Sequence, residues 1–220
     1  MTMLRMLRLG ASSLALICLL GQVNSVGAQP CSARQCPGIG LAYPGGVNDN
    51  FAPPEDPASP RPAFLTFAIN AGAGITDFDG NDIDEWFLHS FTGLPNTICS
   101  ATLTIRLKPL GSSNNDGIAF QFDENTNTFG WSEVIQTVAG VNWAAPQPAV
   151  DLTFDLGCLP PDGFGRTSVL AQVNATGHLD IRVQDDTSVD FISLEICYDC
   201  PTPTKSTTWG GIKARHITSE

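Results

Sequence analysis

The feature of this sequence that most constrains its fold is a set of short segments in which apolar and polar residues alternate. Residues 101–108 are the clearest case, because Leu103, Ile105 and Leu107 fall on one side while threonines and basic residues fall on the other. A period of two is that of a β-strand with one face buried and the other in water. The segment ends at Pro109, which cannot continue a central strand.

Similar segments, separated by turn-forming residues, run through most of the chain. The further strands are expected at residues 64–69, 85–91, 118–122, 131–138, 149–156, 167–173, 178–183 and 189–198. We expect residues 167–173 and 178–183 to form a hairpin around residues 174–177. Short strands at this spacing, with no helix in the core, predict an all-β fold: a single antiparallel β-sandwich of jelly-roll-like arrangement.

The first 28 residues have the pattern of a secretory signal peptide. Arg5 and Arg8 precede an apolar run at residues 9–20, and small residues follow up to Ala28. The run is about 12 residues long, whereas a bilayer span needs roughly 20. We therefore expect a mature chain that starts near Gln29, has no membrane span and is secreted or extracellular, with the periplasm or the cell surface as further locations.

The mature chain divides into three parts by composition. Residues 29–62 are rich in proline and glycine, which excludes a helix or a central strand and predicts an extended segment. The β-sandwich domain is expected at residues 63–200, and a linker and tail at residues 201–220.

Six cysteines follow the leader, which is an even number: Cys31, Cys36, Cys99, Cys158, Cys197 and Cys200. In an exported chain this predicts disulfide bonds. We expect Cys99 to pair with Cys158, and Cys31 and Cys36 to pair with each other or with Cys197 and Cys200. The alternative is a zinc site, since Cys197 and Cys200 have C-x-x-C spacing.

The mature chain is strongly acidic. The sequence has 11 Lys and Arg against 22 Asp and Glu, and Arg5 and Arg8 leave with the leader, so the net charge falls from −11 to −13. Such a chain repels phosphates, which excludes nucleic acid as an expected partner. The acidity fits either a soluble exported surface or the binding of divalent cations.

Two acidic segments are candidates for calcium binding, because calcium takes 6–8 oxygen ligands from carboxylates and carbonyls. The candidate ligands are Asp77, Asp79, Asn81, Asp82 and Asp84 in one segment and Asp185, Asp186 and Asp190 in the other. The first does not have EF-hand spacing, because Gly80 is fourth rather than sixth from Asp77. The alternative is a pair of solvated turns, and sequence leaves open whether the two segments meet.

Enzyme motifs are missing from this sequence. It has no G-x-S-x-G, no H-E-x-x-H and no phosphate loop, and its three histidines are not paired at ligand spacing. His89 is interpreted as a histidine of a strand. A hydrolase that uses two carboxylates remains an alternative, with candidates Glu85, Glu124, Glu133 and Glu195.

Exposed aromatic rings would indicate carbohydrate binding. Trp143 lies in a loop-like stretch and is the tryptophan most expected to reach the surface, ahead of Trp86, Trp131 and Tyr43. The alternative is that these rings pack in the core.

Residues 89–95, 101–107, 114–116 and 184–191 resemble uncharacterised exported bacterial domains. The resemblance implies a jelly-roll-like sandwich and brings no activity with it. Residues 209–213, Trp-Gly-Gly-Ile-Lys, resemble the short W-G-x-[I/V]-K endings of some secreted bacterial proteins, which implies a sorting or docking role.

The sequence thus predicts an exported, disulfide-bonded, non-enzymatic β-sandwich that acts as a binding or structural module, with calcium as a candidate cofactor. Its expected partners are a polysaccharide, a cell-surface component or another copy of the chain. A carbohydrate-binding module and a secreted hydrolase with paired carboxylates are the alternatives.

Overall fold

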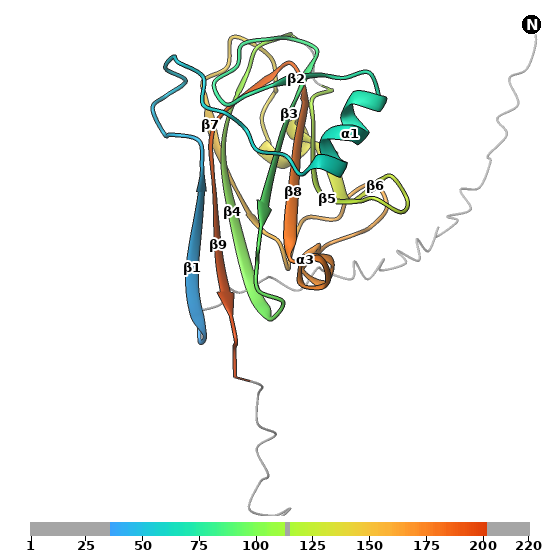
Figure 1. The fold of residues 1–220 in the computed structure, drawn as a ribbon. Helices are drawn as coiled ribbons and strands as arrows, with labels where there is room; N and C mark the ends of the chain where they lie inside the picture. Colours follow the sequence, from blue (N-terminus) through green and yellow to red (C-terminus); the bar gives the residue numbers. More distant parts are fainter. Residues whose placement is uncertain (1–35, 113–114, 202–220) are drawn as a thin grey trace, which may run out of the picture. The chain divides into compact units, whose positions relative to one another are not determined.

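The computed structural model describes residues 36–112 and 115–201, which form nine strands and three short helices (Figure 1). In chain order these are β1 (Ile39–Gly45), α1 (Pro62–Asn70), β2 (Gly74–Thr76), β3 (Glu85–Thr92), β4 (Ile98–Pro109), β5 (Gly117–Asp123), β6 (Thr128–Val134), α2 (Ile135–Ala139), β7 (Val150–Asp155), α3 (Leu170–Thr176), β8 (His178–Asp185) and β9 (Thr187–Tyr198). The predicted leader, Cys31, Asn114 and the Trp-Gly-Gly-Ile-Lys tail lie outside the described residues.

The strands form two sheets. One has four strands in the order β1-β9-β4-β7, and the other has five in the order β2-β3-β8-β5-β6. Neighbouring strands are antiparallel except for β2 and β3, which are parallel. The predicted all-β sandwich is therefore confirmed.

Apolar and polar residues alternate along β4, and the apolar side of the strand lies in the core between the sheets. Leu103, Ile105 and Leu107 are fully buried, as the period of two predicts. Leu103 lies opposite Leu194 of β9, and Ile105 lies opposite Ile192, so two strands present apolar side chains to the same interior. Each such burial is worth about 1.5–3 kcal/mol relative to exposure.

The segment at residues 64–69 is a helix, and the prediction of a strand there is wrong. Pro62 occupies the first turn of α1, where its missing N–H is harmless. Phe64 and Ala68, four residues apart, are buried, and the Phe67 ring lies 4.5 Å from that of Phe122 on β5. Short apolar runs fit either structure by pattern alone, and here the outer face of the five-stranded sheet supplied the packing surface.

Two further strand predictions are corrected. The prediction for residues 131–138 holds only in part, since they are the end of β6 followed by α2, and the prediction for residues 167–173 is wrong, since they are loop and the start of α3. Both helices end at a glycine in the left-handed region, Gly140 at φ 66° and Gly177 at φ 70°. The expected hairpin around residues 174–177 is absent, because β8 pairs with β3 and β5 instead.

The proline-rich segment contributes an edge strand. β1 pairs with β9 alone in the four-stranded sheet, with Pro44 opposite Ser193. An edge strand tolerates proline because one side of its backbone needs no partner. The sequence predicted that this segment holds no central strand, and β1 lies at the edge of its sheet.

The disulfide bonds differ from the expected pairing at one point. Cys36 pairs with Cys197, which ties the N-terminal segment to the end of β9, as one of the expected alternatives has it. Cys99 pairs with Cys200 and not with Cys158, because β9 runs alongside β4 and brings Cys200 to it. Cys158 is also disulfide-bonded. The bonded cysteines are not free to ligate zinc, so the alternative of a zinc site is wrong for Cys36, Cys197 and Cys200.

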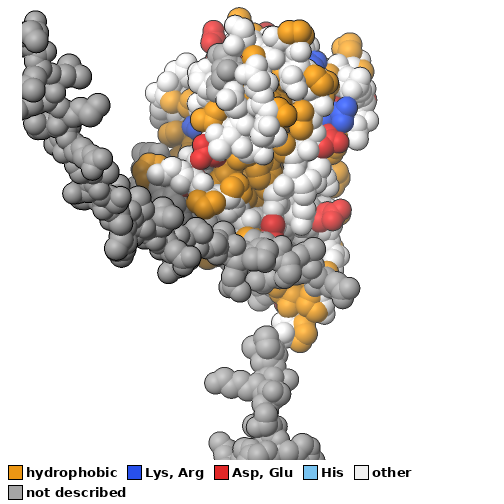
Figure 2. Space-filling model, turned by 180° about the vertical axis from the view of Figure 1, so that it is seen from behind, with side chains coloured by type: hydrophobic (Ala, Val, Ile, Leu, Met, Phe, Trp, Pro, Cys, Tyr) orange, Lys and Arg blue, Asp and Glu red, His pale blue; other side chains and the backbone are white. Residues whose placement is uncertain are grey.

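The face turned away from the reader in Figure 1 is drawn in Figure 2. Charged side chains of both signs are scattered over it among apolar and polar ones, without a patch of one sign on its described part. In the described part of the chain, none of the helices has the length and hydropathy that crossing a membrane requires.

Candidate functional site

The two acidic segments come together at one end of the sandwich, in two separate clusters. The first cluster consists of Asp49, Asp79 and Asp190. In both clusters each residue offers one carboxylate oxygen that lies within 4.8 Å of those of the other two. Asp84 lies with Asp185 and Asp186. Sequence reasoning missed Asp49, whose only signal was its place in the polar run of residues 48–50.

Three of the predicted ligands lie in neither cluster. Asp77 accepts a hydrogen bond from the backbone N–H of Ala58 at 2.9 Å and so anchors the N-terminal segment. The amide of Asn81 donates to the backbone carbonyl of Asp79 at 3.1 Å, and Asp82 is exposed. These side chains organise the loop between β2 and β3 or face solvent.

Asp79 is a buried carboxylate without a hydrogen-bonding partner. It is 2% exposed, and among the described residues neither of its oxygens accepts a hydrogen bond. Its backbone N–H donates to the carbonyl of Val189 at 2.7 Å, which holds the loop against β9. Burial, followed by the charges of Asp49 and Asp190, raises the pKa of Asp79 to about 7.

Asp190 is fully buried on β9 and makes several contacts. Its Oδ1 accepts hydrogen bonds from the backbone N–H groups of Phe51 at 3.1 Å and Asp49 at 3.4 Å. Its Oδ2 lies 3.2 Å from the Nε of Arg106 on β4, and Arg106 also pairs with the half-exposed Asp151 at 2.9 Å. Asp190 therefore joins the N-terminal segment to the four-stranded sheet.

The second cluster is more exposed and its carboxylates already have donors. The backbone N–H of Asp84 donates to Asp186 at 3.2 Å, and the side-chain amide of Asn115 donates to Asp185. Burial and the neighbouring Asp186 and Asp84 raise the pKa of Asp185. This cluster has the properties of a hydrogen-bonded turn.

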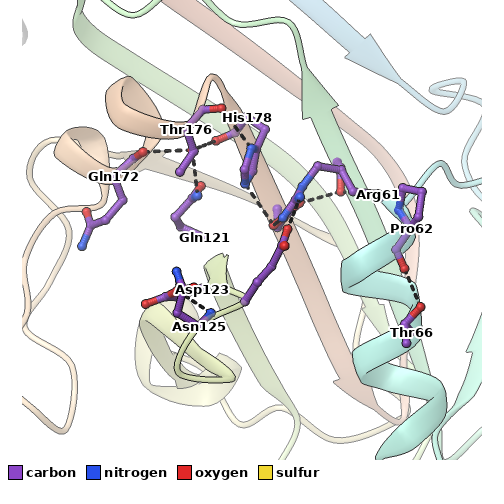
Figure 3. Close-up of polar contacts among 12 residues, drawn as sticks. Arg61, Pro62, Thr66, Gln121, Asp123, Asn125, Gln172, Thr176 and His178 are labelled. Carbon is purple, nitrogen blue, oxygen red and sulfur yellow. Dashed lines mark hydrogen bonds and ion pairs between the residues drawn. The ribbon is translucent and has the colours of Figure 1, made fainter.

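A separate pocket of about 630 Å³ lies beside the turn between β5 and β6. It is lined by Gln121, Phe122, Asp123, Glu124, Asn125, Thr128, Phe129, Gly130, Arg166, Gln172, Ala175, Thr176 and His178. Figure 3 shows the polar side chains that converge there from β5, the turn and α3. Apart from Glu124, a candidate carboxylate of the hydrolase alternative, none of these residues was singled out from sequence, because they come from three separate stretches, at residues 121–130, 166 and 172–178.

Gln121 is the buried polar group of this pocket. It is 2% exposed and has φ of 61°, in the left-handed region that few residues with a side chain adopt. Its Nε2 donates to the hydroxyl of Thr176 at 3.1 Å, and that hydroxyl contacts the carbonyl of Gln172 at 2.9 Å (Figure 3). Among the described residues, the Oε1 of Gln121 accepts no hydrogen bond. An acceptor left in this state costs about 1–3 kcal/mol.

One wall of the pocket rests on a buried ion pair. The guanidinium of Arg61 donates to both oxygens of Asp180, at 3.0 and 2.7 Å, and Asp180 also accepts from the hydroxyl of Ser90 at 2.6 Å. The guanidinium of Arg61 also forms an ion pair with Glu124, which lines the pocket. The Nε2 of His178 lies 3.7 Å from the carboxylate of Asp180. This network fixes the residues that surround Gln121 (Figure 3).

An exposed aromatic ring lies next to the pocket. Phe164 is 83% exposed, and the guanidinium of Arg166, which lines the pocket, lies 4.9 Å from its ring centroid. Asp162 accepts hydrogen bonds from the backbone N–H groups of both Phe164 and Arg166 at 2.9 Å. These bonds hold the backbone of the loop that carries the exposed ring.

The prediction that Trp143 is exposed is wrong. Its ring is 0% exposed, and its Nε1 donates to the hydroxyl of Thr187 at 2.8 Å. The stretch around it folds over the end of the core, and a buried indole needs such an acceptor for its N–H. Trp143 has no ring face available to a ligand, and the alternative of core packing is correct for it. Trp131 is buried in the same way, with its Nε1 on the carbonyl of Pro160.

The remaining catalytic candidates are dispersed. Glu85, Glu133 and Glu195 lie on β3, β6 and β9 and do not line the pocket, whereas Glu124 does. His89 is a histidine of β3, as predicted; it is 8% exposed, and its Nδ1 accepts a hydrogen bond from the N–H of Ser59 at 3.3 Å. Burial lowers the pKa of His89 to about 4.

Comparisons with known proteins place few limits on this chain. No protein-family model matches it, and no curated protein sequence matches it. Among solved structures it is similar to the CBM35, a carbohydrate-binding module, from Cellvibrio japonicus Abf62. That likeness has a TM-score of 0.32 and 14% sequence identity, and it covers 73% of this chain and 100% of the other. The β-sandwich assignment itself rests on the two sheets described above.

Proposed function

We propose that this chain is a non-enzymatic, exported binding module whose pocket beside the β5–β6 turn holds a saccharide. The observation that carries the proposal is Gln121, a residue that lines the pocket and whose buried side-chain oxygen accepts no hydrogen bond among the described residues. A ligand hydroxyl that reached that oxygen through a rotation of the amide would satisfy it and recover the free energy that its isolation costs.

The lining of the pocket suits a saccharide better than a purely apolar or strongly charged ligand. Sugar hydroxyls both donate and accept, and the pocket offers amide groups, hydroxyls and carboxylates for both roles. Phe122 and Phe129 also line the pocket, but their rings pack against Phe64 and Phe67 under α1, so recognition depends mainly on the polar groups. A volume of about 630 Å³ is within the usual range for a small-molecule site.

The carboxylates of this pocket favour binding over hydrolysis. A glycosidase needs one carboxyl group with a raised pKa to act as general acid. Hydrogen bonds from the Asn125 backbone and the Thr126 hydroxyl lower the pKa of Asp123 instead. Glu124 forms an ion pair with Arg61. Neither group is in the environment that a general acid requires.

Export is supported by two independent features. The first 28 residues have the pattern of a signal peptide, and the described part of the chain contains the bonds Cys36–Cys197 and Cys99–Cys200. Disulfide bonds persist in oxidising compartments outside the cytoplasm.

The proposal is tested by screening the secreted chain against neutral and acidic glycans, followed by calorimetric titration of a glycan that binds. Gln121→Leu should weaken binding about tenfold or more, because it removes the buried acceptor. Gln184→Leu, on β8 and outside the pocket, is the matched control and should leave binding unchanged.

Three results would contradict the proposal. Binding that survives Gln121→Leu would place the ligand elsewhere. Release of reducing ends from a bound glycan would make the chain a hydrolase. Failure to bind any glycan would favour a structural or surface module without a saccharide ligand.

A further inference from the structure

We propose that Asp49, Asp79 and Asp190 hold a calcium ion that fastens the N-terminal segment at residues 46–60 onto the sandwich. The site is at the loop end where residues 77–84 and 185–190 meet, and it shares no residue with the pocket. The inference is therefore independent of the proposed saccharide binding.

The first argument is the state of Asp79. Its carboxylate is buried, both oxygens lack a donor among the described residues, and they face the carboxylates of Asp49 and Asp190. Proteins bury carboxylates together only where a counter-charge, a metal or a bound proton compensates them, and Asp79 has no cationic partner among the described residues. An ion among the three carboxylates would give the Asp79 oxygens their missing partner.

The second argument is charge balance. Arg106 contacts the cluster at Asp190 and pairs with Asp151 as well. Neither Asp49 nor Asp79 forms an ion pair with any Lys, Arg or His of the described residues. A divalent cation matches the charge of the two carboxylates that remain unbalanced.

The third argument is what the site joins. Asp49 belongs to the segment between β1 and α1, Asp79 to the loop between β2 and β3, and Asp190 to β9. The segment already hydrogen-bonds across this end, because the Phe78 N–H donates to the carbonyl of Asp56 at 3.0 Å. An ion shared by three segments this distant in sequence would hold them together as a cross-link does.

The ligand chemistry selects calcium. All three groups are carboxylates, and no histidine or cysteine takes part, so the site favours a hard cation over zinc or copper. Irregular loops accommodate the variable geometry of calcium, whereas magnesium demands near-ideal octahedral coordination. Modules outside the cell bind calcium at about 10⁻⁴–10⁻³ M.

The experiment is thermal unfolding of the secreted chain in EDTA, in calcium and in magnesium, each metal at about 10 mM. Calcium should raise the Tm by about 5–10 °C over EDTA, and magnesium by much less. Asp79→Asn should abolish the calcium response. Because it removes an uncompensated buried charge, it should melt in EDTA at or above the temperature of the parent chain.

Asp82→Asn is the matched control, since it makes the same change in the same loop at an exposed residue outside the cluster, and it should keep the full response. Asp49→Asn tests the site at an exposed ligand, where folding is not at risk, and should reduce the calcium response. An unchanged Tm in calcium would overturn the proposal. So would an equal response to magnesium, or an equal loss in Asp82→Asn and Asp79→Asn.

Discussion

Lowering the pH from 7 to 4 is expected to destabilise this protein through His89. The imidazole lies on β3 among the rings of Phe78, Phe87 and Phe91, and burial lowers its pKa from 6.5 to about 4. The folded state therefore disfavours the charged imidazole, which the unfolded chain accommodates in water.

The magnitude follows from the displacement of the pKa. Between pH 6.5 and 4 the unfolded state binds a proton at His89 that the folded state does not, so the free energy of unfolding falls as the pH falls. A displacement of about 2.5 units at 1.36 kcal/mol per unit gives a loss of about 3 kcal/mol. The stabilisation from the neutral imidazole is fully present above pH 6.5. Below about pH 4 the free energy of unfolding no longer changes through His89, because both the folded and the unfolded state carry the proton.

The assay is urea denaturation at a series of pH values, compared with His89→Gln. Glutamine does not titrate and keeps an acceptor for the N–H of Ser59, whereas the carboxylates titrate in both proteins. The difference between the two curves of free energy against pH therefore isolates His89. Parallel curves between pH 6.5 and 4 would refute the reasoning, because they would mean that the imidazole charges without penalty in the folded protein.

Three further predictions concern packing and buried polar groups. Phe64→Ala, under α1, should lower the free energy of unfolding by about 3–5 kcal/mol in urea, whereas Phe164→Ala on the exposed loop should change it by less than about 0.5 kcal/mol; equal losses would contradict the burial difference. Asp180→Ala should cost about 3–5 kcal/mol in the same assay, because it removes the buried partner of Arg61 and leaves the guanidinium only the half-exposed Glu124, and a loss below about 1 kcal/mol would show that the pair is dispensable. Trp143→Phe should cost about 0.5–1.5 kcal/mol through the lost hydrogen bond to Thr187, without changing glycan binding; weaker binding would mean that the ring takes part in recognition.

The strands with a strict period of two were located correctly from sequence. β4 is the example, since its alternation predicted both its existence and the side that it buries. The apolar run at residues 64–69 failed, because a short run fits a helix and a strand equally well, and only the available packing surface decides between them.

The residues of the candidate sites also divide into those that the sequence pattern indicated and those that it did not. Acidic segments at residues 77–85 and 185–190 were visible in the sequence as possible cation ligands, and Asp79, Asp84, Asp185, Asp186 and Asp190 lie in the two clusters. Asp49 was missed because a single aspartate in a proline-rich segment has no pattern of its own. Gln121 was missed because burial without a hydrogen-bond donor is a property of its neighbours and not of its residue type.

By itself, the sequence determined the all-β class, an even set of cysteines from Cys31 onwards, and the acidic composition, because each depends on local periodicity or on counts. Only the tertiary structure decided which cysteines pair, that Trp143 is buried, and which three aspartates share one end of the sandwich. These outcomes depend on contacts between segments up to about 160 residues apart, as in the bond between Cys36 and Cys197 with a separation of 161. Such contacts are fixed by how the sheets pack, and no local pattern encodes them.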